Sequence, residues 1–333
     1  MVHHGDVRKV LPTLRAGQYD CVVTSPPYWG LRDYGDHRQL GLEKSPWAYL
    51  DSMVAVFREI RRVMKPSGTL WLNMGDSYAG DGGGQSYHDS RLKVKDMMGL
   101  PWRLAFALQD DGWYLRRDHV WHKPNVMPES APDRATTAHE YIFLLTKSER
   151  YYFNHEAGKE PCSPNTHLRG PRPVGHLVYD GLRMQRAGVN PKSVAGWDRG
   201  PGSHSTVNHN KVRGLASGRM GRAPGWRSRQ NESFSKAISG AGLTHRKARS
   251  CDPVVRPEVW SFPTSPYSGA HFATFPAELP RRCLLLGCPP GGRVLDPFAG
   301  SGTTLAVAKE LGLQADGVEC VRRNIGLIKK RLG

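Results

Sequence analysis

Residues 294–304 read VLDPFAGSGTT, and this stretch decides the fold. An apolar run that ends in an acidic residue precedes a glycine loop, and a helical pattern begins near Thr303. Gly300 and Gly302 let the backbone turn tightly and approach a ligand closely. The first turn of the helix points its free N–H groups toward that ligand. A strand, a glycine loop and a helix in this order are how doubly wound α/β folds bind a nucleotide-like ligand.

The residues around the loop narrow the class of ligand. A P-loop for phosphate needs a Gly-Lys-Ser/Thr step, which is missing, and a dinucleotide loop needs a third glycine where this chain has Leu305. Asp296 would repel a pyrophosphate, whereas it suits S-adenosylmethionine, which carries an ammonium and a sulfonium. Glu319 closes the next apolar run, in the position from which a carboxylate accepts hydrogen bonds from ribose hydroxyls. The pattern therefore favours S-adenosylmethionine as the cofactor over a nicotinamide.

A second motif, TSPPYWG at residues 24–30, directly follows the apolar run at 19–24 (YDCVVT). Ligands of open α/β sheets bind beyond the carboxyl ends of strands, so this motif is expected beside the glycine loop. Its two prolines stiffen the turn and lack N–H groups, so their carbonyls can point outward. Ser25 can accept a hydrogen bond, and Tyr28 offers a flat face for a base. Together these groups can hold an exocyclic amino group by its protons and leave its lone pair facing a methyl donor.

The rest of the chain alternates apolar runs with helical patterns, which predicts an α/β fold with a mostly parallel sheet. The Ser45-Pro46 pair marks a helix start, and Lys65 to Gly68 should stop that helix. Expected strands are residues 19–24, 69–73, 114–121, 141–146, 293–296 and 314–319, and further expected helices are 101–108, 276–286 (ended by Gly287), 303–311 and the last segment.

The middle of the chain differs in composition from both flanks. Residues 160–255 hold 16 Lys or Arg residues against five Asp or Glu residues, so they carry about +11 of the total charge of +17. They form either a basic linker without its own fold or an inserted nucleic-acid-binding region. We expect three segments: 1–158, the insert 159–255, and 256–333. Arginines of the insert that are candidates for phosphate or guanine contacts are Arg213, Arg219, Arg222, Arg227 and Arg229.

The two motifs together resemble the signatures of the DNA amino-methyltransferases, which are an [S/D/N]-P-P-[Y/F] tetrad and an F-x-G-x-G loop. Here they are residues 25–28 (SPPY) and 298–302 (FAGSG). The tetrad precedes the loop, which resembles the β group of the family, a circular permutation of the commoner order. Gly5-Asp6 is similar to the family's segment at the cofactor adenine, and residues 271–276 (HFATFP) to the segment at its methionine part.

The resemblance implies a Rossmann-like, doubly wound fold, S-adenosylmethionine as cofactor, and a target-recognition role for the insert. It implies that duplex DNA is the substrate and that the target base is flipped out of the helix. No covalent enzyme intermediate is implied. The residues that it assigns to the target base are Ser25, Pro26, Pro27 and Tyr28. Those that it assigns to the cofactor are Asp6, Asp296, Pro297, Phe298, Ala299, Gly300, Ser301, Gly302, Thr303 and Glu319.

Serine at the head of the tetrad is typical of the family's N4-cytosine enzymes, and Asp or Asn of its N6-adenine enzymes. Ser25 thus favours methylation of cytosine N4, with adenine N6 as the alternative. A DNA-binding protein that kept the fold without activity is the alternative of another class. Trp29 and Tyr34 either stack on the flipped base or pack in the core, and Lys123 either contacts phosphate or is solvated.

Several further expectations follow from composition. The charge of +17 favours an anionic partner, here double-stranded DNA. The resemblance to DNA amino-methyltransferases implies a cognate restriction endonuclease, as in a restriction-modification system, as a further candidate partner. A second copy of the chain is another candidate. No apolar run approaches the roughly 20 residues that span a bilayer, so we expect a soluble, cytoplasmic protein without membrane contact. None of the six cysteines forms a C-x-x-C pair, so no metal site is expected, and Cys283 and Cys288 are expected in the core.

Overall fold

The computed structural model divides the chain into two compact units, Met1–Glu160 with Val255–Gly333, and Pro161–Val254. Short strands β6 (Glu160–Pro161) and β9 (Val254–Val255) lie at the boundaries, and β7 (Val178–Asp180) pairs with β8 (Arg183–Gln185) in an antiparallel hairpin. The structure describes residues 1–33, 35–36, 38–80, 91–161, 178–180, 183–185, 254–255, 257–264 and 275–333.

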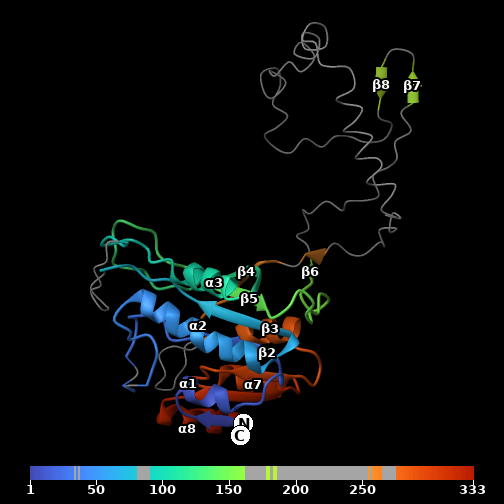
Figure 1. Cartoon of the computed structure of the whole chain (residues 1–333). Helices are drawn as coiled ribbons and strands as arrows, with labels where there is room; N and C mark the ends of the chain where they lie inside the picture. The colour runs from blue at the N-terminus through green and yellow to red at the C-terminus, as the bar shows by residue number, and fades with distance from the viewer. Residues whose placement is uncertain are drawn as a thin grey trace, which may run out of the picture. The chain divides into compact units, whose positions relative to one another are not determined.

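The first unit is built on an eight-stranded sheet with the order β1-β12-β11-β2-β3-β5-β4-β10. Strands β2 and β3 are neighbours in this sheet (Figure 1). Within this sheet β5 alone is antiparallel to its neighbours, so the predicted mostly parallel α/β sheet is confirmed. The strands are β1 (Val2–His4), β2 (Tyr19–Thr24), β3 (Met64–Met74), β4 (Tyr114–His122), β5 (His139–Thr146), β10 (Val259–Ser261), β11 (Arg293–Asp296) and β12 (Gln314–Glu319).

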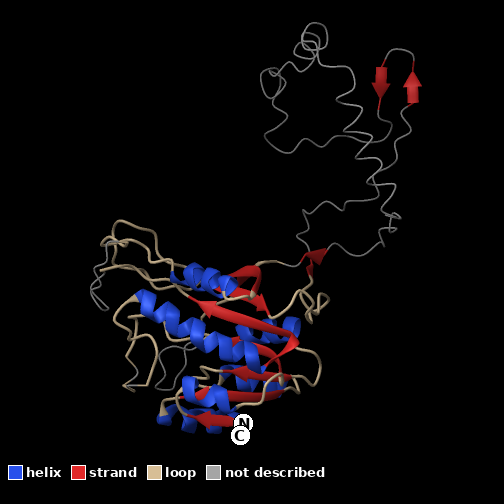
Figure 2. Ribbon diagram, in the orientation of Figure 1, coloured by secondary structure: helices blue, strands red, loops and turns tan. Residues whose placement is uncertain are grey.

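Helices connect these strands and pack on both faces of the sheet (Figure 2). The predicted start of α2 is confirmed, because Ser45 caps it by accepting a hydrogen bond from the Ala48 N–H at 3.1 Å, and Pro46 is its first residue. The helices are α1 (Val7–Val10), η1 (Leu11–Thr13, a 3₁₀ turn), α2 (Pro46–Val63), α3 (Leu100–Asp110), α6 (Glu278–Gly287), α7 (Thr303–Glu310) and α8 (Arg322–Leu332).

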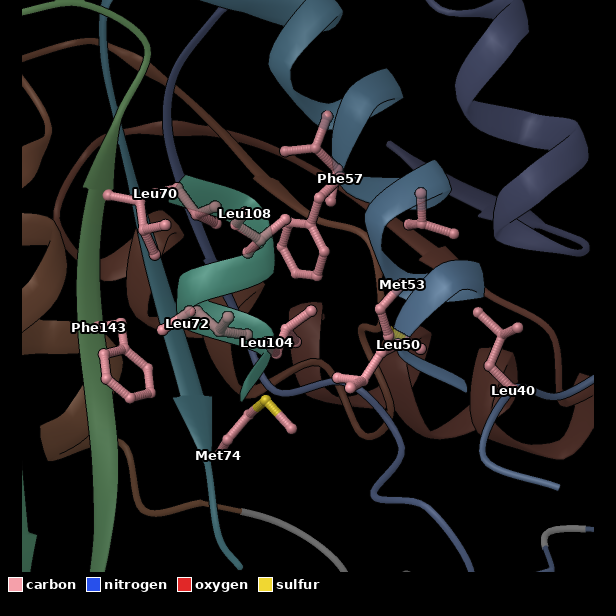
Figure 3. Packing of buried hydrophobic residues seen from close by; sticks show 14 of the residues in the cluster. Leu40, Leu50, Met53, Phe57, Leu70, Leu72, Met74, Leu104, Leu108 and Phe143 are labelled. Atoms are coloured by element: carbon pink, nitrogen blue, oxygen red, sulfur yellow. The ribbon is translucent and has the colours of Figure 1, made fainter. Parts of the chain in front are cut away.

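An apolar cluster lies on each face of the sheet, because successive side chains of a strand point to opposite faces. In β2, Val22 packs in the cluster under α2 and α3, while Cys21 and Val23 pack in the cluster under α6 and α7. Each fully buried large side chain contributes about 2 kcal/mol through the apolar area it removes from water. Figure 3 shows part of the first cluster, with Met53, Phe57, Leu70, Leu72, Leu104, Leu108 and Phe143 packed together.

Two expectations about local structure need correction. Strand β3 begins at Met64 rather than Thr69. Met64 pairs with Tyr19 of β2, so residues 65–68, which were expected to lie between the helix and the strand, belong to the strand. Helix α6 begins at Glu278 rather than Pro276, and it ends at Gly287 as expected. Position 287 requires glycine because a Cβ there would overlap the Trp71 indole and the Thr69 hydroxyl.

The direction of the connections fixes the place where a ligand binds. From β11, the chain passes through α7 to β12 on one side, and from β2 it passes through α2 to β3 on the other side. Strands β11 and β2 are neighbours, so the two connections diverge between them and leave a crevice at their carboxyl ends. The tetrad follows β2 and the glycine loop follows β11, so both motifs lie at this crevice.

Across the described residues, no helix is both long enough and apolar enough to cross a membrane. Cys21, Cys283 and Cys288 are buried free thiols, which confirms Cys283 and Cys288 as core residues. Burial raises the pKa of the Cys288 thiol to about 12, so that thiol stays protonated near neutral pH.

Candidate active site

A cavity of about 730 Å³ opens at the crevice between β2 and β11. That volume is in the range of cofactor-binding pockets. The cavity brings together all four residues of the tetrad with four residues of the predicted cofactor site, although about 270 residues separate the two motifs in the chain. These lining residues are Ser25, Pro26, Pro27, Tyr28, Pro297, Phe298, Gly300 and Glu319.

Asp296 lies behind the cavity wall instead of lining it. Its side chain is 1% exposed, and its Oδ1 accepts hydrogen bonds from Thr24 Oγ1 at 2.7 Å and from the Phe298 N–H at 3.1 Å. Burial raises the pKa of Asp296 to about 6, because removing the carboxylate from water disfavours its charged form. Asp296 therefore joins the ends of β2 and β11 and supplies a negative charge from beneath the glycine loop.

The inner side of the glycine loop is also turned away from the cavity. Arg331 of α8 donates hydrogen bonds to Ser301 Oγ at 3.0 Å and to Thr303 Oγ1 at 2.8 Å, and both side chains are buried. Gly302 has a φ of +80°, in the left-handed region that favours glycine, and a Cβ there would lie 3.1 Å from Ile328. Ala299 is also buried. Ala299, Ser301, Gly302 and Thr303 were predicted as cofactor contacts, but in the structure they support the loop on the side that faces away from the cavity.

The hydrogen bonds of the Asp6 carboxylate are made within its own segment, at the start of α1. Its carboxylate caps α1 by accepting from the Arg8 N–H at 2.9 Å, and it accepts from the Arg8 guanidinium at 2.7 Å. The cavity is lined at this point by Gly5 and Val7. The predicted contact between Asp6 and the cofactor stays a prediction.

Glu319 ends β12 at the cavity and is 7% exposed. It accepts a hydrogen bond from the Val321 N–H at 2.6 Å, and burial raises the pKa of its carboxyl. Beside it, Asn324 lines the cavity and is 3% exposed, and its Oδ1 has no hydrogen-bond partner within the described part of the chain. A buried acceptor without a partner is costly, so the site fits a ligand that brings donors, such as the hydroxyls of a ribose.

The tetrad is held by hydrogen bonds on both sides. Ser25 Oγ donates to the Tyr28 hydroxyl at 3.3 Å, and the Tyr28 hydroxyl donates to Glu140 Oε2 at 2.9 Å. Burial, and secondly the charge of Glu140, raise the pKa of the Tyr28 phenol well above its usual range. The carbonyl of Pro27 accepts from the Tyr49 hydroxyl at 2.9 Å, which fixes the turn.

For Trp29 and Tyr34, which follow the tetrad, the sequence left open whether they contact the base or pack in the core. Trp29 is 3% exposed and donates its indole N–H to the Glu43 carbonyl at 2.8 Å, so it packs in the core, as one of the two interpretations held. Tyr34 lies outside the described residues.

The polar residues of the cavity wall that sequence reasoning missed include Asn73 and Glu140 in addition to Asn324. Asn73 lies near the end of β3 and donates to Glu140 Oε2 at 2.9 Å, and Lys123, just after β4, forms an ion pair with Glu140 Oε1. Lys123 is 17% exposed, so the structure gives it a partner in the cavity wall, and its phosphate contact stays a prediction. For Glu140 the missing signal was the antiparallel direction of β5, because it brings the start of that strand to the edge where its neighbours end. Asn73 lies near the carboxyl end of β3, where the rule for ligand sites already pointed.

Other candidates cannot be placed. The five arginines of the insert and residues 271–274 lie outside the described residues, whereas Phe275 lines the cavity. Among the residues that the structure describes, no group of three His, Cys, Asp or Glu side chains could hold a metal ion.

Comparison with known proteins agrees with this fold and shows the family to which the chain belongs. The model of the DNA methylase family N6_N4_Mtase matches residues 19–330, and the chain belongs to this family. Within the family it is a DNA amino-methyltransferase of the β group. Similar sequences include the Type II methyltransferases M.SmaI of Serratia marcescens (37% identical, covering 98% of this chain and 89% of the relative) and M.Cfr9I of Citrobacter freundii (37% identical, covering 98% and 86%).

Solved structures share the fold at lower sequence identity. The PvuII DNA methyltransferase, cytosine-N4-specific, superposes with a TM-score of 0.58 at 15% identity, covering 100% of this chain and 86% of that one. The protein TTHA0409 of Thermus thermophilus, complexed with S-adenosyl-L-methionine, gives 0.53 at 23% identity, covering 99% and 92%.

Proposed function

We propose that this DNA methyltransferase transfers a methyl group from S-adenosylmethionine to the exocyclic N4 of cytosine in duplex DNA. The observation that carries the proposal is the position of Ser25, which lines the same cavity as the glycine loop. In the family a serine at this position is typical of N4-cytosine enzymes, whereas N6-adenine enzymes typically have Asp or Asn there.

The residues of the cavity fit the cofactor. Glu319 and the unpartnered Oδ1 of Asn324 are two buried acceptors that suit the ribose hydroxyls. Gly300 and Phe298 line the space next to them, and Asp296 beneath the loop offers a negative charge to a cationic ligand. When bound, S-adenosylmethionine supplies an electrophilic methyl carbon.

The tetrad would position the target amine. Ser25 directs its own proton to Tyr28, so its lone pairs are free to accept a hydrogen bond from the amine, and the Pro26 carbonyl would accept a second one. The amine is a poor nucleophile because its lone pair is delocalised into the ring. Two acceptors on its protons shift the nitrogen toward sp³ character and turn the lone pair toward the methyl donor. Alignment of the two reactants is expected to supply most of the rate.

The target base has to leave the duplex to enter this cavity. We assign sequence recognition to the basic insert at 159–255, because its charge of about +11 suits a phosphate backbone. The contacts that Arg213, Arg219, Arg222, Arg227 and Arg229 make with DNA belong to the same proposal. Since the relatives are named Type II methyltransferases, a restriction endonuclease with the same target site is the partner we propose.

The test is to incubate the purified protein with S-adenosylmethionine and mixed-sequence duplex DNA, digest the DNA to nucleosides, and identify the products by mass spectrometry. N4-methylcytosine is the expected product. N6-methyladenine would show that Ser25 does not select cytosine, and the proposal would then be replaced by adenine methylation. Cofactor binding without any methylated nucleoside would contradict the proposed activity and favour a DNA-binding protein without catalysis.

A further inference from the structure

Glu140 lies at the end of a continuous chain of hydrogen bonds that starts at the tetrad. Ser25 Oγ–H donates to the Tyr28 hydroxyl oxygen at 3.3 Å, and Tyr28 O–H donates to Glu140 Oε2 at 2.9 Å. Both donors point the same way, away from the target amine and toward the carboxylate. The chain therefore connects the position of the target amine with a negatively charged acceptor.

The surroundings of Glu140 hold its carboxylate in one place. Asn73 Nδ2 donates to Oε2 at 2.9 Å, and the Lys123 ammonium pairs with Oε1. The side chains of Glu140 and Lys123 are 16% and 17% exposed, so neither can move freely in solvent. Gly75 leaves no spare room, because a Cβ there would lie 3.1 Å from the Tyr28 ring and 3.3 Å from Cγ of Glu140.

Methylation of an amine releases one proton. The nitrogen lone pair forms the bond to the methyl carbon, and the bond from that carbon to sulfur breaks with its electron pair left on sulfur. The nitrogen then holds one proton more than the product retains. This methylated nitrogen is strongly acidic, because losing the proton restores the delocalisation of the lone pair into the ring. A carboxylate is therefore a sufficient base.

We propose that Glu140 is the terminal acceptor of this proton, reached through the hydroxyls of Ser25 and Tyr28. The amine proton passes to Ser25 Oγ as the serine proton passes to Tyr28, and the tyrosine proton passes to Glu140 Oε2. Both hydroxyls end with one proton each, and the carboxylate is neutralised. This inference rests on the proposed methylation of an amine, and it holds for cytosine and adenine alike.

The state of Tyr28 agrees with this assignment. Burial, together with the charge of Glu140, raises the pKa of the phenol well above its usual range, so Tyr28 does not hold a negative charge at neutral pH. A phenol in that state gives up its proton only as it receives another. The acceptor must then lie beyond Tyr28, where the structure has Glu140.

The experiment compares Glu140→Gln, Tyr28→Phe and the double variant with the wild-type chain. Glu149→Gln is the matched control, because Glu149 is 76% exposed on the surface. Single-turnover methyl transfer is measured in H₂O and D₂O on a duplex that carries the site mapped for the wild-type enzyme. The dissociation constants for S-adenosylmethionine and for the duplex are measured in parallel, and thermal melting verifies that each variant is folded.

The expected loss is about 100-fold in the single-turnover rate for Glu140→Gln and for Tyr28→Phe, the size typical of a lost proton acceptor. Because the two groups act in one chain, the double variant should be no slower than the slower single variant. The solvent isotope effect of the wild type should shrink in both variants, while both dissociation constants stay within about twofold of the wild type. Glu140→Asp, which keeps a carboxylate, should retain more of the rate than Glu140→Gln.

Three results would overturn the proposal: a Glu140→Gln rate close to that of the wild type, losses that multiply in the double variant, or a rate that falls only in step with weaker binding of cofactor or DNA. The last of these would make Glu140 a residue that shapes the cavity. The base methylated by the wild-type chain tests the proposed function separately, since the relay is judged only by the ratio of each variant to the wild type.

Discussion

The hydrogen bond from Thr24 to Asp296 joins the ends of two strands that are 272 residues apart, and Thr24→Val should break it without changing the shape of the side chain. Both residues are almost completely buried, so water cannot replace the lost donor. A hydrogen bond to a charged group contributes about 1.5–3 kcal/mol. For a folded unit of this size, a loss of roughly 2 kcal/mol lowers the melting temperature by about 5 °C.

The effect should depend on pH, because the pKa of Asp296 is raised to about 6. A raised carboxyl pKa means that the folded state binds the proton more tightly than the unfolded state. Its contribution to stability is therefore present below the usual value of 3.8 and is lost as pH rises through about 6. Thr24→Val removes a donor to the charged form, so its cost should be about twofold larger at neutral pH than at about pH 5, where the carboxyl is mostly neutral.

Thermal unfolding followed by circular dichroism at the two pH values measures this difference. Thr24→Ser is the matched control, because it keeps the hydroxyl and loses only a methyl group, and its cost should be the same at both pH values. An equal loss of melting temperature for Thr24→Val at both pH values would refute the argument that the Thr24 hydroxyl stabilises an ionised Asp296.

Three further predictions concern other parts of the fold and the site. Gly287→Ala should lower the free energy of unfolding by about 1–3 kcal/mol in denaturant titrations, because the added methyl group overlaps the Trp71 indole. Burial lowers the pKa of His119 to about 4, so the wild type should lose up to about 3 kcal/mol as pH falls from 6.5 through 4, and His119→Phe should lose less. Glu319→Gln should weaken binding of S-adenosylmethionine by about 10- to 100-fold in calorimetry, because the proposed site loses a charged acceptor for the ribose.

Controls for these variants are available in the chain. Gly326→Ala should be neutral or stabilising, because nothing lies within 4 Å of the added methyl group in α8. Glu149→Gln should leave the affinity for the cofactor unchanged, because that side chain is 76% exposed. An acid-induced loss that is the same in His119→Phe as in the wild type would show that another group titrates. Full stability of Gly287→Ala would show that α6 can shift away from β3.

Much of the fold and of the site could be predicted from the sequence, because the decisive signals are local. The run YDCVVT and the helix start at Ser45-Pro46 specify their elements through burial pattern and capping, and both are found as expected. The strand, the glycine loop and the helix at residues 293–310 likewise follow from side-chain chemistry within a few residues. The rule that ligands bind beyond the carboxyl ends of parallel strands then correctly placed the tetrad beside the loop.

The sequence was less informative where side-chain direction matters. It marked residues 296–303 as a cofactor loop, but no pattern shows which of them face the ligand. Pro297, Phe298 and Gly300 line the cavity, whereas Ser301 and Thr303 are turned inward to Arg331 of the last helix. That contact depends on how α8 packs, which local sequence does not encode.

The sequence by itself determined the α/β class, the two motifs, and their order along the chain, because each rests on residues that are neighbours in sequence. Only the tertiary structure decided that Asp296 lies behind the loop with Thr24 as its partner, and that Glu140 belongs to the site. Glu140 lies at the start of its strand, so a rule that looks beyond the carboxyl ends of strands could not find it. The reversed direction of β5 brings it to the tetrad, and that direction is fixed by pairing between strands that lie far apart in the sequence.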